Sequence, residues 1–185
     1  MPETKNPWKT LKVTEIYDNP WIHIDEHDVI NPSGNPGIYG TIHFKNIACG
    51  IIPLDNDNTT WIVGQYRYAL NRYSWEIPMG GVAVGTDLLT GAQRELKEET
   101  GLTAAHWNKF LEVDLSNSVT DEIGAVFVAE GLTRGKPEFE ETEQIEIREL
   151  PFNDLVQMAL DGQITDVLSA AAILKLAAIR SRQEQ

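Results

Sequence analysis

The segment 80–102, GGVAVGTDLLTGAQRELKEETGL, constrains the fold more than any other part of this 185-residue chain. Its apolar residues follow the three- and four-residue spacing of one helix face, at Leu88, Leu89, Ala92 and Leu96. Thr86 or Asp87 can cap the start of such a helix, and Gly101 can end it. The segment therefore predicts an amphipathic helix over residues 87–99 that packs against a core.

The polar edge of this helix carries an unusual set of charges. Glu95, Glu98 and Glu99 stand at i, i+3 and i+4, which places three carboxylates on one face. Their mutual repulsion favours a hard divalent cation such as Mg²⁺ or Mn²⁺, whose preferred ligands are oxygens. Arg94 can pair with one of the carboxylates and hold its rotamer. Taken alone, the three glutamates also fit a solvated acidic helix edge. The residues around them must therefore distinguish a metal site from a solvated surface.

That pattern resembles the Nudix box, G-x5-E-x7-R-E-U-x-E-E-x-G-U, in which U is aliphatic. Gly80 stands six residues before Thr86, seven residues separate Thr86 from Arg94, and RELKEETGL follows. Every fixed position matches except Thr86, which occupies the first glutamate position. In the family this glutamate braces the box arginine, and Asp87 could compensate for its loss in part.

The resemblance extends from about residue 10 to residue 175 and points to one branch of the family. The segments DNPW (18–21), GIYG (37–40) and WEIP (75–78) are similar to those of Nudix enzymes that cleave ADP-ribose and nucleotide sugars. The loop 115–119 lacks the proline common in ADP-ribose-cleaving relatives, so GDP-mannose is a further candidate substrate. The family implies an α/β/α sandwich with a mixed sheet, in the α/β (α+β) class.

The same resemblance implies an activity and its residues. The activity is Mg²⁺-dependent (or Mn²⁺-dependent) hydrolysis of the diphosphate of a nucleoside diphosphate sugar, which yields a nucleoside monophosphate and a sugar 1-phosphate. Arg94 would orient the carboxylates, and the small Gly80 and Gly81 would let backbone approach metal and phosphate. The implied metal ligands are Glu95, Glu98, Glu99 and the carbonyl of Met79.

A second acidic cluster lies at 138–146. By itself the cluster indicates an exposed acidic loop. However, EETE (140–143) resembles the family loop that supplies the general base. The resemblance implies Glu141 as the base and Glu143 as a second metal-linked residue. Glu122 is a further candidate for contact with substrate or metal, or else a strand-start acid.

Arg67 precedes the WEIP segment and Glu76 lies within it, and both are candidate substrate-binding residues. Arg67 resembles a family arginine that contacts phosphate, and a salt bridge with Glu76 is the alternative. Four aromatic residues could stack a nucleobase, although aromatic residues at strand spacing usually belong to a core; they are Tyr66, Tyr68, Tyr73 and Trp75. The four histidines show no metal-ligand spacing along the sequence.

Composition excludes several classes of function. The formal charge is −13, from 28 acidic and 15 basic residues, so we expect no nucleic-acid partner. The longest apolar run, 170–179, is far shorter than the ~20 residues that span a bilayer. The N-terminus lacks the apolar region of a signal peptide, and a single cysteine, Cys49, suits a reducing compartment. We therefore expect no membrane partner and a cytoplasmic protein.

The sequence divides into two predicted parts. Residues 1–45 read as antiparallel strands with turns at Asn19-Pro20 and 31–37, and 46–185 as the Nudix domain. Because few helices are available to cover the first part, we predict that it packs on a second copy in a homodimer. Expected strands are 11–17, 21–25, 38–44, 47–54, 60–66, 107–113, 123–130 and 144–149, with a hairpin loop at 55–58 and C-terminal helices from Pro151 and from Thr165 or Asp166.

Two functions therefore stand as hypotheses. The first is the nucleoside diphosphate sugar hydrolase. The second is a Nudix-fold regulator that binds such nucleotides without efficient cleavage, which Thr86 motivates. Retention of all three box carboxylates favours the enzyme.

Overall fold

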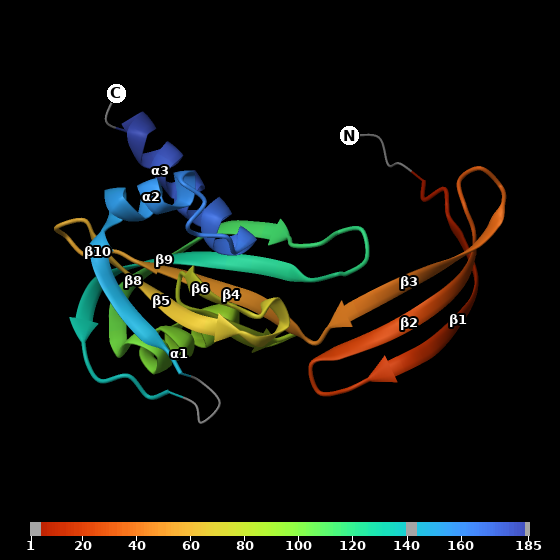
Figure 1. Ribbon diagram of the computed structural model, residues 1–185, viewed down its shortest axis with the longest axis horizontal. Helices are drawn as coiled ribbons and strands as arrows, with labels where there is room; N and C mark the ends of the chain where they lie inside the picture. The colour runs from red at the N-terminus through yellow and green to blue at the C-terminus, as the bar shows by residue number, and fades with distance from the viewer. Residues whose placement is uncertain (1–4, 140–143, 184–185) are drawn as a thin grey trace. The chain divides into compact units, whose positions relative to one another are not determined.

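The computed structural model describes residues 5–139 and 144–183 and divides them into two compact units (Figure 1). The first unit comprises the chain up to Asn46 together with Asp114–Glu122. The second comprises Ile47–Val113 and the chain from Ile123 onward. Each unit has its own secondary structure.

The first unit is an antiparallel sheet in the order β1-β2-β3. Its strands are β1 (Lys9–Asp18), β2 (Ile22–Ile30) and β3 (Pro36–Phe44). The predicted turns are confirmed, since Asn19 Oδ1 accepts two backbone N–H groups after β1 and Asn31 Oδ1 accepts two after β2. All three strands are longer than predicted because the turns use few residues.

The second unit contains two sheets, with strand orders β7-β4-β9-β8 and β10-β5-β6. The strands are β4 (Asn46–Pro53), β5 (Thr59–Arg67), β6 (Arg72–Glu76), β7 (Met79–Ala83), β8 (Leu102–Asp114), β9 (Ile123–Arg134) and β10 (Glu146–Pro151). Strands β4 and β9 pair in parallel, whereas β5 is antiparallel to both of its neighbours. The predicted mixture of strand directions is confirmed.

Two strand predictions need correction. Residues 55–58 form a tight turn, but β4 and β5 share only the bridge Leu54–Thr60 and then enter different sheets, so they are not a regular hairpin. Strand β8 begins at Leu102 rather than at residue 107. It does so because Gly101, at φ 73°, ends the preceding helix and turns the chain directly into the sheet.

Three helices cover the sheets of the second unit. They are α1 (Leu88–Thr100), α2 (Phe152–Leu160) and α3 (Val167–Gln183). Helix α1 lies on one side of the strands, and α2 and α3 lie on the opposite side (Figure 1). This arrangement is the expected α/β/α sandwich. Within the described residues, no helix is long and apolar enough to cross a membrane.

The apolar stripe of α1 packs as its spacing predicts. Ala92 and Leu96 are fully buried, and they join a core cluster with Cys49, Ile51 and Phe127. Burying a leucine side chain contributes roughly 2 kcal/mol to the free energy of unfolding. Core packing therefore fixes the rotation of α1 about its axis, and with it the direction of the acidic edge.

Cys49 provides a direct test of this packing. Its side chain is fully buried, and burial, aided by the charge of Glu95, raises the pKa of its thiol from 9.0 to about 12. We expect no reaction with a disulfide reagent such as DTNB in the native protein near neutral pH, because the thiolate is the reactive form. One thiol per chain should react after unfolding in guanidinium. Rapid labelling of the native protein would contradict the packing of α1 on β4.

The raised pKa of Cys49 also determines how the stability of the fold depends on pH. The folded-state pKa of the thiol lies above its ordinary value, so this contribution to stability is complete below pH 9.0 and is lost as the pH rises toward about 12.

Candidate functional site

The acidic edge of α1 is partly withdrawn from solvent. Glu95 and Glu99 are 8% and 2% exposed, and Glu98 lies between them with a more accessible side chain. Helix geometry explains the burial of Glu95 and Glu99. They stand one residue before and three residues after the buried Leu96, and so lie at the edge of the face that packs on the core. Buried carboxylates require neutralisation by cations or hydrogen-bond donors, so this edge is a site rather than a solvated surface.

Arg94 supplies part of that neutralisation. Its Nη1 lies 2.6 Å from Glu98 Oε2, and its Nη2 contacts Glu95 Oε1. Partial burial opposes the charge on the guanidinium, but the charges of Glu95 and Glu98 outweigh it and raise the pKa of Arg94. The sequence predicted a pairing with one carboxylate. The structure shows that Arg94 bridges two, which fixes their relative positions.

The start of β7 closes against the same carboxylates. The backbone N–H of Met79 donates to Glu99 Oε2 at 2.9 Å. The next residue, Gly80, lies so close to the carboxylate of Glu95 that a Cβ atom at Gly80 would overlap it. Only glycine therefore permits this approach of backbone and carboxylate. The Met79–Gly80 segment and the carboxylates of Glu95 and Glu99 form one compact arrangement.

Arg67 and Glu76 form a salt bridge beside this arrangement. Arg67 Nε lies 3.0 Å from Glu76 Oε1, and Arg67 Nη2 contacts Glu76 Oε2. The hydrogen bond that Arg67 donates to Glu76 is the main cause of the raised pKa of Arg67, and the charge of Glu99 adds to it. The sequence left phosphate contact and a salt bridge open. The structure shows the salt bridge, with Glu99 near enough to act on it.

Thr86 and Asp87 shape the start of the helix. The hydroxyl of Thr86 donates to the carbonyl of Ala83 at 2.6 Å and closes the turn before α1. Asp87 is the N-cap, and its Oδ2 accepts from the backbone N–H and the hydroxyl of Thr90. Its carboxylate is therefore engaged at the helix start. The expectation that Asp87 compensates in part for the missing glutamate stays a prediction.

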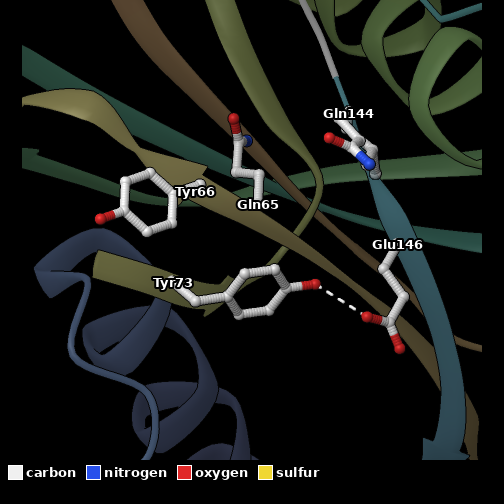
Figure 2. Close-up of a pocket in the computed structure, with 6 residues that line it drawn as sticks. Gln65, Tyr66, Tyr73, Gln144 and Glu146 are labelled. Atoms are coloured by element: carbon white, nitrogen blue, oxygen red, sulfur yellow. Dashed lines mark hydrogen bonds between the residues drawn. The ribbon is translucent and has the colours of Figure 1, made fainter. Parts of the chain in front are cut away.

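A pocket of about 390 Å³ lies on the sheet β10-β5-β6 (Figure 2). Tyr66 and Tyr73 are register partners on adjacent strands, so their side chains share a face, which is opposite to that of Arg67. Tyr73 donates a hydrogen bond to Glu146 Oε2 at 2.9 Å, and partial burial together with Glu146 raises the pKa of Tyr73. Both tyrosines therefore line a polar pocket and do not belong to a core.

Comparison with known proteins agrees with this geometry. Residues 45–170 match the NUDIX domain, and residues 8–42 match the nucleoside diphosphate sugar hydrolase N-terminal domain. The chain belongs to the Nudix family. Its Nudix helix is α1, and the segment 80–102 is its Nudix box.

Relatives and a solved structure are similar over almost the whole chain. An ADP-ribose pyrophosphatase of Bacillus subtilis is 30% identical over 96% of this chain and 96% of its own length. The methanol dehydrogenase activator of Bacillus methanolicus is 28% identical over 89% of this chain and 90% of its own. The crystal structure of an ADP compounds hydrolase superposes with a TM-score of 0.85 at 18% identity, covering 98% of each chain, and supports the Nudix fold.

The remaining predicted site residues lie elsewhere or outside the described residues. Glu141 and Glu143 fall within 140–143 and are not described. Glu122 ends the segment 114–122 of the first unit, where its carbonyl accepts from the backbone N–H of Leu115. Gly81 lies in β7 next to Gly80 and is exposed. The structure thus brings Met79, Gly80 and the three box glutamates together with Arg94.

One cluster of possible metal ligands was not predicted from the sequence. Asp25, His27 and His43 place one ligand atom each within 4.8 Å of one another in the first unit. The expectation that the histidines hold no metal-ligand arrangement considered spacing along the chain only. The alternation H-x-D-x-H at residues 23–27 was a usable signal, because alternate residues of a strand share a face.

Proposed function

We propose that this Nudix protein hydrolyses the diphosphate bond of nucleoside diphosphate sugars such as ADP-ribose or GDP-mannose, releasing a nucleoside monophosphate and a sugar phosphate. The observation that carries the proposal is the pair of buried carboxylates, Glu95 and Glu99, held against the backbone of Met79 and Gly80. The match of residues 8–42 to the nucleoside diphosphate sugar hydrolase N-terminal domain supports this substrate class.

The donor set suits Mg²⁺, with Mn²⁺ as a substitute. Glu95, Glu98 and Glu99 offer hard oxygen ligands, to which the carbonyl of Met79 adds a neutral one. Arg94 offsets only part of their charge, which leaves the edge of α1 attractive to a cation. A divalent ion bound there would polarise a P–O bond and lower the pKa of a bound water.

The chain's own residues would orient and assist the reaction. Arg94 holds Glu95 and Glu98 in register, and we propose that the absence of side chains at Gly80 and Gly81 lets metal and phosphate approach the backbone. Glu141 is our proposed general base, whose loss typically lowers turnover by ~10²–10⁴-fold. We propose that Arg67, held by Glu76, contacts phosphate. We also propose Glu122 as a substrate contact and Glu143 as a metal ligand.

A substrate panel tests the proposal most directly. The full chain would be incubated with ADP-ribose, GDP-mannose and other nucleotide sugars in Mg²⁺ or Mn²⁺, and phosphatase-coupled phosphate release would be measured. We expect phosphate release from at least one substrate only when the metal and the phosphatase are both present. No turnover with either metal across the panel would reject the proposal.

A regulatory role is the second candidate. Thr86 in place of the first box glutamate and the similarity to a methanol dehydrogenase activator motivate it. It predicts tight nucleotide-sugar binding by calorimetry together with negligible hydrolysis. Micromolar binding accompanied by rapid turnover would favour the enzyme instead.

The two parts of the chain suggest different tasks. We propose that residues 46–185 carry the catalytic site and that residues 1–45 form a homodimer contact in a cytoplasmic enzyme. Strand β1 supports this, since Leu11, Val13 and Ile16 are each about half exposed on one thin sheet. Light scattering after gel filtration should give twice the chain mass of 20.7 kDa, and a monomer mass would reject the dimer.

Thr86→Glu tests the proposed brace behind Arg94. We expect tighter Mg²⁺ activation and at most a several-fold change in turnover, because the metal-binding glutamates are already held by Arg94. The measurement is turnover as a function of Mg²⁺ concentration in both proteins. If turnover appeared only in the variant, Thr86 would be a missing catalytic group and the wild-type chain would be a regulator.

A further inference from the structure

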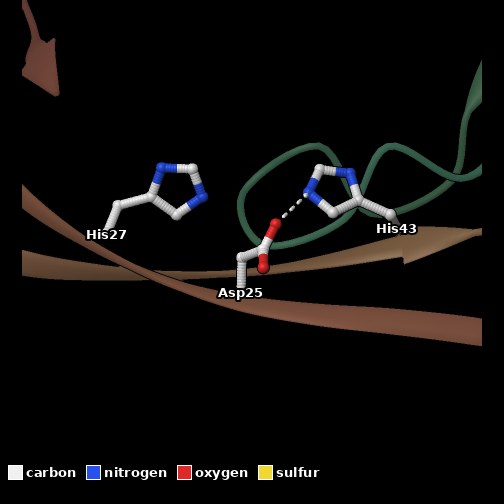
Figure 3. Close-up of side chains that lie close together, drawn as sticks. All are labelled: Asp25, His27 and His43. Atoms are coloured by element: carbon white, nitrogen blue, oxygen red, sulfur yellow. Dashed lines mark ion pairs between the residues drawn. The ribbon is translucent and has the colours of Figure 1, made fainter. Parts of the chain in front are cut away.

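One face of the first unit's sheet carries a second set of metal-binding side chains, which are partly buried. His23, Asp25 and His27 alternate along β2 and share one face of the sheet. The antiparallel register pairs His23 with His43 and Asp25 with Thr41, so β3 adds both side chains to that face. Figure 3 shows Asp25 between the rings of His27 and His43. All five residues belong to one compact unit.

The hydrogen bonds around His43 leave the lone pair of its Nε2 atom available to bind a cation. Asp121 Oδ2 lies 2.7 Å from His43 Nδ1, and a carboxylate only accepts, so Nδ1 carries the hydrogen of the neutral ring. The lone pair of His43 is then on Nε2, which lies 3.7 Å from Asp25 Oδ2 and 3.1 Å from Thr41 Oγ1. A carboxylate behind a histidine ligand is the usual outer partner in protein metal sites.

His27 approaches the same point from the other side. Its Nε2 also lies 3.1 Å from Thr41 Oγ1, so one hydroxyl lies between two imidazole nitrogens. A hydroxyl has a single hydrogen and can donate to only one of the two rings, whereas a cation accepts a lone pair from both rings when each Nε2 is unprotonated. Tetrahedral zinc requires ligand atoms about 3.3 Å apart, and small side-chain rotations would bring the three ligands from within 4.8 Å to that spacing.

Charge and access favour a cation as well. The carboxylates of Glu15, Asp18, Asp25 and Asp121 surround the imidazoles, and Lys45 pairs with Asp18. A pocket of about 210 Å³ adjoins the cluster and is lined by His27 and Thr41 among other residues. An ion can therefore reach His27 and Thr41 from solvent.

We propose that Asp25, His27 and His43 bind a divalent transition-metal ion, with Zn²⁺ the best match, at a site separate from the Nudix helix. Two imidazole nitrogens and one carboxylate are the ligand types that Zn²⁺ prefers, whereas Mg²⁺ prefers an all-oxygen set such as that of α1. The fourth position is open to water or to the hydroxyl of Thr41. Asp121 is a positioning residue that acts through His43.

Zinc titration of the full chain tests this site without reference to hydrolysis. The protein would carry Glu99→Gln and contain saturating Mg²⁺, so that binding at α1 contributes little. We expect one equivalent of Zn²⁺ per chain by calorimetry, and a visible absorption band of low-symmetry Co²⁺ when that ion is used. Loss of hydrolytic activity in Glu99→Gln has no bearing on this readout, so the two proposals can fail separately.

Variants locate the bound ion. His27→Gln and His43→Gln should each weaken Zn²⁺ binding by more than tenfold, and Asp121→Asn by about 10- to 100-fold with His43 still present. His106→Gln is the matched control, because His106 is an exposed histidine of β8 in the other unit, and it should bind as the parent does. Circular dichroism would establish that each variant is folded. Absence of Zn²⁺ binding in the parent, or equal affinity in all four variants, would reject the site.

Discussion

Glu99→Gln is expected to lower nucleotide-sugar turnover by roughly 10²–10⁴-fold. A metal-ion contribution of about 3–5 kcal/mol to the barrier corresponds to a change of this size. The substitution removes the negative charge and keeps the shape of the side chain. The amide oxygen can still accept the hydrogen bond that Met79 N–H makes to Glu99 Oε2, so the local fold should persist. The measurement is kcat/KM at saturating Mg²⁺, with melting temperature as the test of folding.

Glu112→Gln is the matched control for this prediction. Glu112 is an exposed residue of β8 that pairs with Lys109, and exposed ion pairs contribute about 0–1 kcal/mol. Its replacement should leave turnover and melting temperature almost unchanged. Wild-type turnover in Glu99→Gln would remove α1 from the catalytic site, and equal losses in both variants would point to a general effect of charge.

Gly80→Ala should separate the geometry of the site from its charge. The new methyl group would overlap the carboxylate of Glu95, which is the end of a flexible side chain and therefore moves aside. We expect about a 10- to 100-fold loss of activity at low Mg²⁺, with partial recovery at high Mg²⁺, because one ligand is displaced while the charge set is intact. Since φ of Gly80 is not positive, alanine fits the backbone, and the melting temperature should change little.

The control for this variant is Gly40→Ala. A Cβ atom at Gly40 meets no atom within 4 Å, so the same chemical change should leave both Mg²⁺ dependence and activity unaltered. A Gly80→Ala protein with a normal Mg²⁺ activation curve would show that Glu95 need not occupy its place beside the backbone. A large fall in melting temperature would instead indicate that the backbone, and not the Glu95 side chain, moves.

The Nudix helix was predictable in detail from the sequence. The apolar stripe, the cap at Asp87 and the stop at Gly101 all lie within a few residues of one another, so local propensity and spacing determine the helix. The mixed strand directions and the helices at Pro151 and Asp166 followed from similarly local signals. The segment 55–58 shows the limit of such signals, because the turn formed as expected while the pairing of β4 and β5 depended on distant strands.

The sequence by itself determined that three carboxylates and Arg94 share one helix edge, because helical periodicity relates residues three and four positions apart. Only the tertiary structure decided that Gly80 closes against Glu95, that Arg67 pairs with Glu76, and that Asp25, His27 and His43 meet. These contacts join different strands and helices, and their geometry depends on sheet register and core packing. Register is set by the summed burial of many side chains and is not encoded in the spacing of the residues that meet.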